Sequence, residues 1–222
     1  MEPPGKPHRV RPATNGKEHV FRSKKRVVGL DLGSSVVKAV ELTLEGQEPV
    51  ITGFSRAELS PGGSVDDAVK QVFKEGRFRS KRVVSGVSGQ DTVVRYLSMP
   101  SMSDSELQQA IQFEADKIVA SEEDFILDCL PLQRGTEEDP SMSVLVAACQ
   151  SERLNGQAQL IQSAGLVPIA IDLDLFAIAN AWELCVMPAP DGPDGGDTRA
   201  TALVDVGSQV TSINVMRGGA SC

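Results

Sequence analysis

Residues 27–42 read Val27-Val28-Gly29-Leu30-Asp31-Leu32-Gly33-Ser34-Ser35-Val36-Val37-Lys38-Ala39-Val40-Glu41-Leu42, a largely apolar run that is interrupted by a Gly-Ser-Ser sequence. The β-branched residues on both sides predict two strands joined by a tight polar turn. In such a turn Gly33 lets the backbone approach an anion with no Cβ in the way, and successive N–H groups converge on phosphate oxygens. Lys38 would supply a point charge for these oxygens, and Asp31, at the end of a buried strand, would hold a hydrated Mg²⁺ ion. The alternative is a plain hairpin in which Asp31 caps the turn and Lys38 is solvated.

A second segment, residues 202–215, repeats this order as Ala-Leu-Val-Asp-Val-Gly-Ser-Gln-Val-Thr-Ser-Ile-Asn-Val. Both segments contain an apolar strand, an aspartate, one apolar residue, a glycine, a polar turn and another strand. Two copies in one chain form an internal repeat, which predicts related half-domains that face a common cleft. The repeat therefore favours a phosphate site over a plain hairpin.

The two segments resemble the first and second phosphate motifs of the actin-like ATPase superfamily, with Lys38 and Thr211 at matching positions. The resemblance implies an α/β chain of the actin-like (ribonuclease-H-like) ATPase fold that binds ATP and Mg²⁺. It also implies roles for individual residues. The nucleotide-binding residues are Asp31, Gly33, Ser34, Ser35, Lys38, Asp205, Gly207, Ser208 and Thr211, the metal ligands are Asp31 and Asp205, and the catalytic residues are Asp172 and Asp205.

Asp172 permits two interpretations, because it precedes an almost wholly apolar run at residues 173–186. The run predicts a helix that is buried on all sides and connects two lobes. Asp172 would be its N-cap or a first-turn carboxylate, or it would position the attacking water near a γ-phosphate. The residues alone favour the cap.

Between the two repeats, residues 91–150 read as strand, helix, strand and strand, which predicts a small inserted α+β module. Ser103 and Glu106 form a capping box at the start of its helix. Phe113 lies off the apolar stripe that follows at helical spacing, which consists of Leu107, Ala110, Ile111, Ala115, Ile118 and Val119. The exposed aromatic favours a binding surface, and the alternative is a packing element with no partner.

Several stretches narrow the resemblance to the family of type IV pilus assembly protein PilM. They are Val93-Val94-Arg95-Tyr96-Leu97-Ser98-Met99-Pro100, Glu106-Leu107, Phe113-Glu114-Ala115 and Ala164-Gly165-Leu166-Val167-Pro168-Ile169-Ala170-Ile171-Asp172. The resemblance covers roughly residues 26–217. Each motif is weak alone, and the combination is specific.

This family resemblance implies a cytoplasmic scaffold on the inner-membrane platform of the pilus machine, with membrane contact only through partners. The scaffold would hold the N-terminal peptide of a PilN-like bitopic protein in a groove between the core and the module. ATP would act mainly as a conformational ligand, hydrolysed slowly at most. Other platform proteins are expected partners, nucleic acid is not, and self-association stays open.

Three other functions stay open. A sugar or acetate kinase of the same fold would need a base beside the acceptor hydroxyl. In the first lobe, no carboxylate can be distinguished as such a base from the carboxylates that cap helices or form turns. A division scaffold like FtsA would need a membrane-targeting helix at the C-terminus. A type II secretion scaffold like GspL would carry a transmembrane segment after its actin-like part.

The expected divisions of the chain follow from these assignments. They are a disordered basic tail at 1–26, a first-lobe core at 27–90, the inserted module at 91–150, a return to the core with the connecting helix at 151–186, a linker at 187–199 and the start of a second lobe at 200–222. Superfamily members continue further, so we expect an incomplete second lobe in a truncated chain that alone is inactive.

Charge and composition add broader limits. The chain has 222 residues, 41% of them hydrophobic, and a net charge of −8. Its first 26 residues hold eight Lys or Arg and two Glu, a charge of +6, so the rest carries −14 and is not a nucleic-acid surface. The basic run at 22–26 is interpreted as a solvated leader, with an anionic leaflet or nucleic acid as alternatives.

No apolar stretch approaches the length of a membrane span, and no secretory signal is visible. The cysteines, at 129, 149, 185 and 222, lack metal-ligand spacing, and the first three are expected to be reduced core residues of a cytosolic protein. Both histidines, His8 and His19, fall in the tail. This placement removes His-based catalysis and most zinc sites from consideration.

Overall fold

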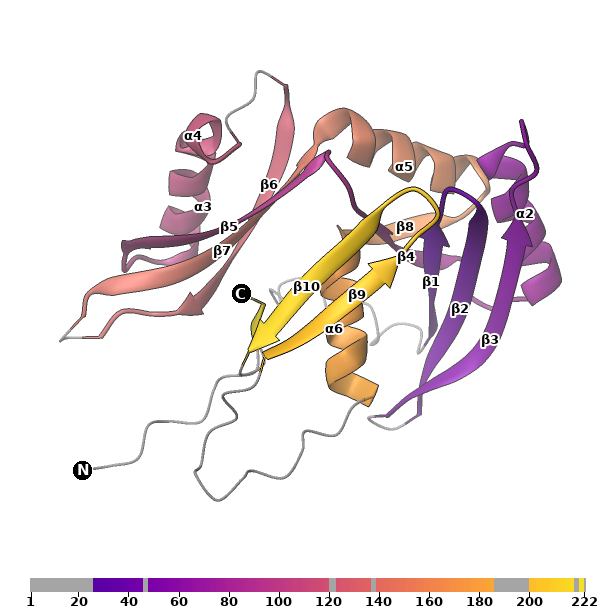
Figure 1. The fold of residues 1–222 in the computed structure, drawn as a ribbon, viewed down its shortest axis with the longest axis horizontal. Helices are drawn as coiled ribbons and strands as arrows, with labels where there is room; N and C mark the ends of the chain where they lie inside the picture. Colours follow the sequence, from indigo (N-terminus) through magenta and orange to yellow (C-terminus); the bar gives the residue numbers. More distant parts are fainter. Residues whose placement is uncertain are drawn as a thin grey trace. The chain divides into compact units, whose positions relative to one another are not determined.

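The structure is a computed structural model that describes residues 26–45, 48–119, 123–136, 139–185, 200–217 and 220–221. The predicted linker and all of the predicted tail except Arg26 lie outside these ranges. The chain forms two compact units (Figure 1). Unit 1 comprises Met1–Val87 and Ile161–Cys222, and unit 2 comprises Ser88–Leu160.

Unit 1 contains a mixed five-stranded sheet in the order β3-β2-β1-β4-β8. Its strands are β1 (Arg26–Leu32), β2 (Val36–Glu45), β3 (Glu48–Glu58), β4 (Arg82–Val87) and β8 (Val167–Leu173). The first three form an antiparallel meander, while β4 runs parallel to both β1 and β8. The buried side chains of β1 and β4 are mainly Val and Leu, which suits the central positions of these strands in the sheet.

Helix α2 (Val65–Gly76) packs against β2 and β3 through Ala68, Val69 and Val72. Asp66 and Asp67 lie in its first turn, where the helix dipole favours negative charge. The N-cap position is Ser64, as predicted, although its side chain makes no capping hydrogen bond.

Helix α5 (Ser151–Ser163) begins at Ser151 itself, so this residue is not the N-cap that the sequence predicted. Gly165 follows the helix with a φ of 74°, which confirms the predicted left-handed stop.

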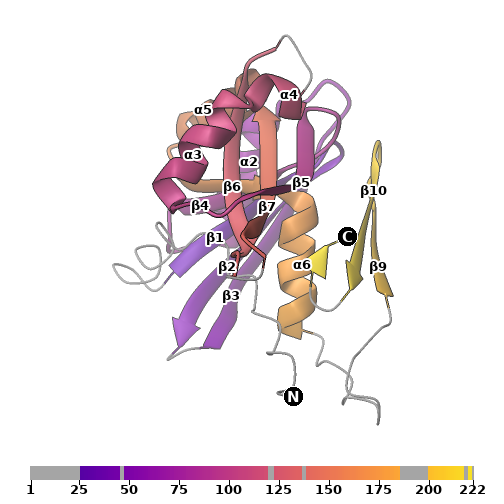
Figure 2. The same cartoon turned by 90° about the vertical axis from the view of Figure 1, so that its left-hand side faces the viewer.

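Unit 2 contains a three-stranded antiparallel sheet, β5-β7-β6, with two helices on one face (Figure 2). The elements are β5 (Thr92–Pro100), α3 (Asp104–Phe113), α4 (Ala115–Val119), β6 (Phe125–Gln133) and β7 (Ser141–Gln150). The capping box at Ser103 and Glu106 is confirmed. The single predicted helix is wrong, because the backbone leaves helical geometry at Glu114, with φ −90° and ψ 5°.

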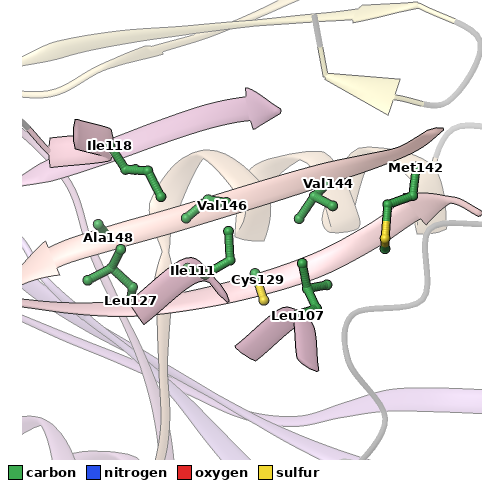
Figure 3. Packing of buried hydrophobic residues seen from close by; sticks show 9 residues of the cluster. All are labelled: Leu107, Ile111, Ile118, Leu127, Cys129, Met142, Val144, Val146 and Ala148. Atoms are coloured by element: carbon green, nitrogen blue, oxygen red, sulfur yellow. The ribbon is translucent and has the colours of Figure 1, made fainter. Parts of the chain in front are cut away.

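The core of unit 2 lies between these helices and the sheet (Figure 3). Leu107, Ile111 and Ile118 point into it from the helices, and Val144 and Val146 point into it from β7. The predicted apolar stripe is therefore confirmed at its three largest residues. Phe113 is 86% exposed, as its position off the stripe predicts.

The second repeat forms an antiparallel hairpin of β9 (Ala200–Val206) and β10 (Thr211–Arg217), with β11 (Ala220–Ser221) beside β10. Helix α6 (Asp174–Cys185) contacts β4, β8 and β10. The prediction that this helix is buried all round is wrong, because only Ala179 is buried and Leu184 is 67% exposed. Three strands contact one part of its surface, and nothing in the described residues covers Leu184.

A buried carboxylate joins the sheet of unit 1 to the loop after α2. Glu41 on β2 is only 3% exposed. Its Oε1 accepts hydrogen bonds from the backbone N–H groups of Arg79 (2.7 Å) and Ser80 (2.9 Å), and its Oε2 accepts one from the Thr52 hydroxyl (3.0 Å). Three donors thus compensate for the loss of water around this carboxylate.

The cysteines differ in exposure. Cys129 and Cys149 are buried free thiols, as predicted, whereas Cys185 is exposed at the end of α6, so the prediction of a core residue is wrong there. Burial raises the pKa of the Cys129 thiol from 9.0 to about 11, with smaller contributions from Asp128 and Asp104. Burial also raises the pKa of Cys149.

We expect iodoacetamide to alkylate Cys185 at least about tenfold faster than Cys129 and Cys149 in the folded chain at neutral pH, because only an accessible thiolate reacts. Peptide mass spectrometry after timed quenching measures the three rates separately. In urea the three rates should converge. Equal rates in the native chain would contradict the burial of the two thiols.

Because the pKa of Cys129 is higher in the fold than in the unfolded chain, its contribution to stability is present below pH 9.0 and is lost as the pH rises through about 11.

Candidate functional site

The first repeat turns at Gly33, between β1 and β2. The strand register places Asp31 directly opposite Lys38, and Lys38 Nζ lies 2.7 Å from Asp31 Oδ2. Both side chains are about half exposed, at 54% and 49%. Lys38 is therefore not a freely solvated side chain, because its ion pair with Asp31 holds it beside the turn.

The second turn, at Gly207, has the same close approach of its glycine to the carbonyl three residues further on. A Cβ built on Gly33 would lie 2.6 Å from the carbonyl oxygen of Val36, and a Cβ on Gly207 would lie 2.7 Å from that of Val210. The Gly207 N–H donates to the Val210 oxygen at 2.9 Å. Neither glycine is among the positive-φ glycines of the described chain, so closure of the turn itself excludes a side chain here. The internal repeat is thus a repeat of structure.

The two turns contact each other through three serine hydroxyls, which we call the serine cluster. Ser208 Oγ lies 2.7 Å from Ser34 Oγ and 2.9 Å from Ser35 Oγ. All three side chains are exposed. Residues 174 positions apart in sequence therefore meet at one point, as the repeat predicts.

The chemistry of these groups suits a phosphate. Each hydroxyl can exchange its hydroxyl partner for a phosphate oxygen. Thr211 starts β10, opposite Val206 in the register.

A Mg²⁺ site would draw on the aspartates that precede the two turns. Asp205 pairs with Ser212 in the register and is exposed, like Asp31. Within the described residues, no three His, Cys, Asp or Glu side chains form a metal-binding group. Mg²⁺ is commonly bound by one or two carboxylates plus water and substrate phosphates. The two exposed aspartates therefore fit a metal that arrives with a phosphate ligand, and they do not fit a protein-only site.

Asp172 lies inside β8, opposite Gly86 of β4. Its Oδ1 accepts a hydrogen bond from the Leu173 N–H at 2.8 Å. Because α6 starts at Asp174, Asp172 is not its cap, and the interpretation that the residues alone favoured is wrong.

Asp174, the first residue of α6, was not predicted from the sequence. A Cβ built on Gly86 would lie 1.9 Å from Asp174 Oδ1, so this carboxylate occupies the space of the missing side chain. An isolated glycine in a strand is a recognised sign of such a close approach, and Gly86 in the run Val83–Val87 was that sign.

A second candidate site is a groove in unit 2, which we call the module groove. It has a volume of about 550 Å³, and β5, α3 and α4 line it. Its apolar lining includes Leu97, Met99, Ala110, Phe113 and Ile118, and its charged lining consists of Arg95, Glu114 and Lys117. Glu114 and Lys117 form an ion pair, whereas Arg95 has no carboxylate partner in the described residues. β5 is an edge strand of its sheet.

Comparison with known proteins gives two kinds of match. The sequence profile of the family described as type IV pilus assembly protein PilM matches residues 29–222. A chain of the solved PilM–PilN type IV pilus biogenesis complex is similar over 88% of this chain, with 25% sequence identity and a TM-score of 0.74. This chain spans 59% of the length of that one. The α/β actin-like ATPase fold with mixed sheets is confirmed.

A second solved structure is the cytoplasmic domain of EpsL, an inner membrane component of the type II secretion system of Vibrio cholerae. It is similar over 86% of this chain and 67% of its own length, with 14% identity and a TM-score of 0.51. This likeness concerns the fold alone. None of the helices in the described part of the chain has the length and apolar character that crossing a bilayer requires.

Proposed function

This chain belongs to the family of type IV pilus assembly protein PilM, and from this premise we propose that it is an actin-like scaffold of the pilus assembly platform on the cytoplasmic side of the inner membrane. The family match over residues 29–222 is the observation that carries the proposal. The serine cluster and the module groove supply two surfaces that such a scaffold needs, one for a nucleotide and one for a partner.

The proposed partner is the N-terminal peptide of a PilN-like protein. The similar solved chain comes from a PilM–PilN complex, which supports a partner of this class. Within unit 2, the module groove joins an apolar floor to an edge strand, and an extended peptide can add to such an edge while its side chains enter the groove. We assign the module groove to the peptide site on this basis.

The proposed ligand at the turns is Mg–ATP, whose polyphosphate would contact both turns. Ser34, Ser35 and Ser208 would donate to its oxygens, Lys38 would balance their charge, and the exposed Asp31 and Asp205 would hold the metal. Roles for Thr211 and for Asp172 near the γ-phosphate belong to the same proposal. Binding at both turns would favour one arrangement of the repeats over others, which makes the nucleotide a conformational ligand.

The peptide proposal is tested by titrating a fluorescent PilN-like N-terminal peptide into the chain. Phe113→Ala is expected to weaken binding about tenfold, because an exposed aromatic at a groove is the type of side chain that anchors a peptide. Ala110→Arg should weaken it further, since the longer side chain fills the groove from α3 without disturbing the helix.

Phe54→Ala is the matched control, because Phe54 is another exposed aromatic, 60% accessible, on β3 of unit 1. It should bind the peptide as the unmodified chain does. Equal binding by the Phe113 and Ala110 variants would exclude the module groove as the peptide site, and no binding by any form would exclude this partner.

A further inference from the structure

The loop between α2 and β4 carries an unusual charge pattern. Residues 77–82 read Arg-Phe-Arg-Ser-Lys-Arg, and we call this segment the basic connector. Arg77, Arg79 and Lys81 are exposed, while the alternate residues Phe78 and Ser80 are turned inward. Phe78 packs edge-on against Phe73, with ring centroids 5.2 Å apart. The connector therefore presents a row of cations at every second residue.

Its backbone is fixed at several points. The N–H groups of Arg79 and Ser80 donate to the buried carboxylate of Glu41, and the Ser80 hydroxyl donates to the Arg26 carbonyl at 3.3 Å. On the other side, the Val167 N–H donates to the Lys81 carbonyl at 2.8 Å. The cationic side chains thus project from a segment that hydrogen bonds fix at one end of the sheet, where β4 begins.

The cations of the basic connector are unpaired in the part of the chain that the structure describes. Within the described residues, the side chains of Arg77, Arg79, Lys81 and Arg82 form no hydrogen bond or ion pair, and the Arg82 Nε is buried without an acceptor. Elsewhere in the described residues, Lys38, Lys70, Lys117, Arg134 and Arg153 pair with a carboxylate, whereas Arg56, Lys74, Arg95 and Arg217 do not. What distinguishes the basic connector is that four unpaired cations lie within six residues, a local excess of positive charge that suits an anionic surface.

The basic connector and the start of β1 lie at the same end of the sheet. Because β4 runs parallel to β1 with Val83 opposite Val28, Arg82 lies at the end of the sheet where β1 begins at Arg26. Gly33 lies at the other end of β1, about 20 Å away at the rise of a strand. An anion at the basic connector would therefore leave the serine cluster accessible.

We propose that the basic connector is a docking surface for anionic phospholipid headgroups, so that the chain touches the membrane directly as well as through a partner. Arginine forks match phosphate groups, and a row of cations against a charged leaflet needs no shaped pocket. The exposed Val167 beside Lys81 adds apolar contact. Nucleic acid fits less well, because the aromatic ring of the connector is packed inside and the chain beyond residue 26 carries −14.

The test is flotation of the full chain with phosphatidylcholine vesicles that contain or lack phosphatidylglycerol. The unmodified chain should bind only the anionic vesicles, and binding should fall as salt is added. Each cation near an anionic leaflet contributes about fivefold to binding. The triple variant Arg77→Gln, Arg79→Gln, Lys81→Gln should therefore bind about a hundredfold less, with the same melting temperature.

The charge-matched control is Arg56→Gln, Arg134→Gln, Arg153→Gln, which removes three cations from other surfaces and should bind nearly as the unmodified chain does. Equal loss in both triple variants would show a general charge effect and overturn the proposal. Failure of the unmodified chain to float would overturn it as well, as would tighter binding to duplex DNA than to the anionic vesicles at the same salt. Since the vesicles contain no protein, none of these outcomes bears on peptide binding at the module groove.

Discussion

Replacing Glu41 with alanine is expected to lower the free energy of unfolding by about 4 kcal/mol. The carboxylate is 3% exposed and accepts three hydrogen bonds. Alanine would leave the buried N–H group of Ser80 and the partly buried N–H group of Arg79 without their acceptor, at about 1–3 kcal/mol each. It would also leave a cavity where the side chain packed.

Glutamine at the same position separates the hydrogen bonds from the charge. Its amide oxygen can accept from both N–H groups, and its NH₂ group can donate to the Thr52 hydroxyl, so Glu41→Gln should cost only about 1 kcal/mol. Glu45→Ala, at an exposed glutamate on the same strand, is the matched control and should stay within about 0.5 kcal/mol.

Urea unfolding followed by circular dichroism gives the three values on one scale. A loss below about 1.5 kcal/mol for Glu41→Ala would mean that water or another group replaces the carboxylate.

Glu41 also shows which features of a buried group can be predicted from the sequence and which cannot. The alternation Val37, Ala39, Glu41 identifies an inward-facing position, so the pattern signals that a carboxylate is buried. It does not identify the donors, because Arg79 and Ser80 lie 38 and 39 residues further along the chain. Local rules fix the direction of a side chain, and the partner depends on how distant segments pack.

Elsewhere too, the predictions that depend on local residues succeeded, and those that depend on distant segments failed. The capping box at Ser103 and the glycine stop at Gly165 depend on residues within one turn, and the structure confirms both. The exposure of α6 and of Cys185 at its end depends on which other elements surround the helix. Apolar composition alone predicts burial but does not supply the covering element.

The candidate site divides in the same way. The repeat around Gly33 and Gly207 is visible in the sequence, because a glycine is required wherever a Cβ would strike the carbonyl three residues on. Contact between Ser34 and Ser208 follows from the repeat only if the two hairpins face each other, and the structure places them in contact. Asp174 was missed because it begins helix α6, whereas its signal, Gly86, lies in β4, far away in the sequence.

Replacing Asp31 with alanine is expected to weaken Mg–ATP binding at the turns at least about thirtyfold, or about 2 kcal/mol, because a charge-assisted contact and the partner of Lys38 are lost together. Lys38→Ala should have an effect of similar size, since the charge that faces the phosphates is removed. Gly33→Ala should be at least as damaging, because its Cβ would lie 2.6 Å from the Val36 oxygen and force the turn open.

A probe without adenine and a matched lysine variant make the test of the phosphate site specific. Isothermal titration with Mg–tripolyphosphate beside Mg–ATP tests the turns without the adenine, since the probe presents only phosphates to the serine cluster. Lys70→Ala is the matched control, because Lys70 is also a half-exposed lysine paired with an aspartate, Asp66, on α2. An exposed pair of this kind adds little stability, so this variant should bind both probes as the unmodified chain does. If Asp31→Ala and Lys38→Ala bind tripolyphosphate with unchanged affinity, the two turns are not a phosphate site, and their serines meet only because the two hairpins pack.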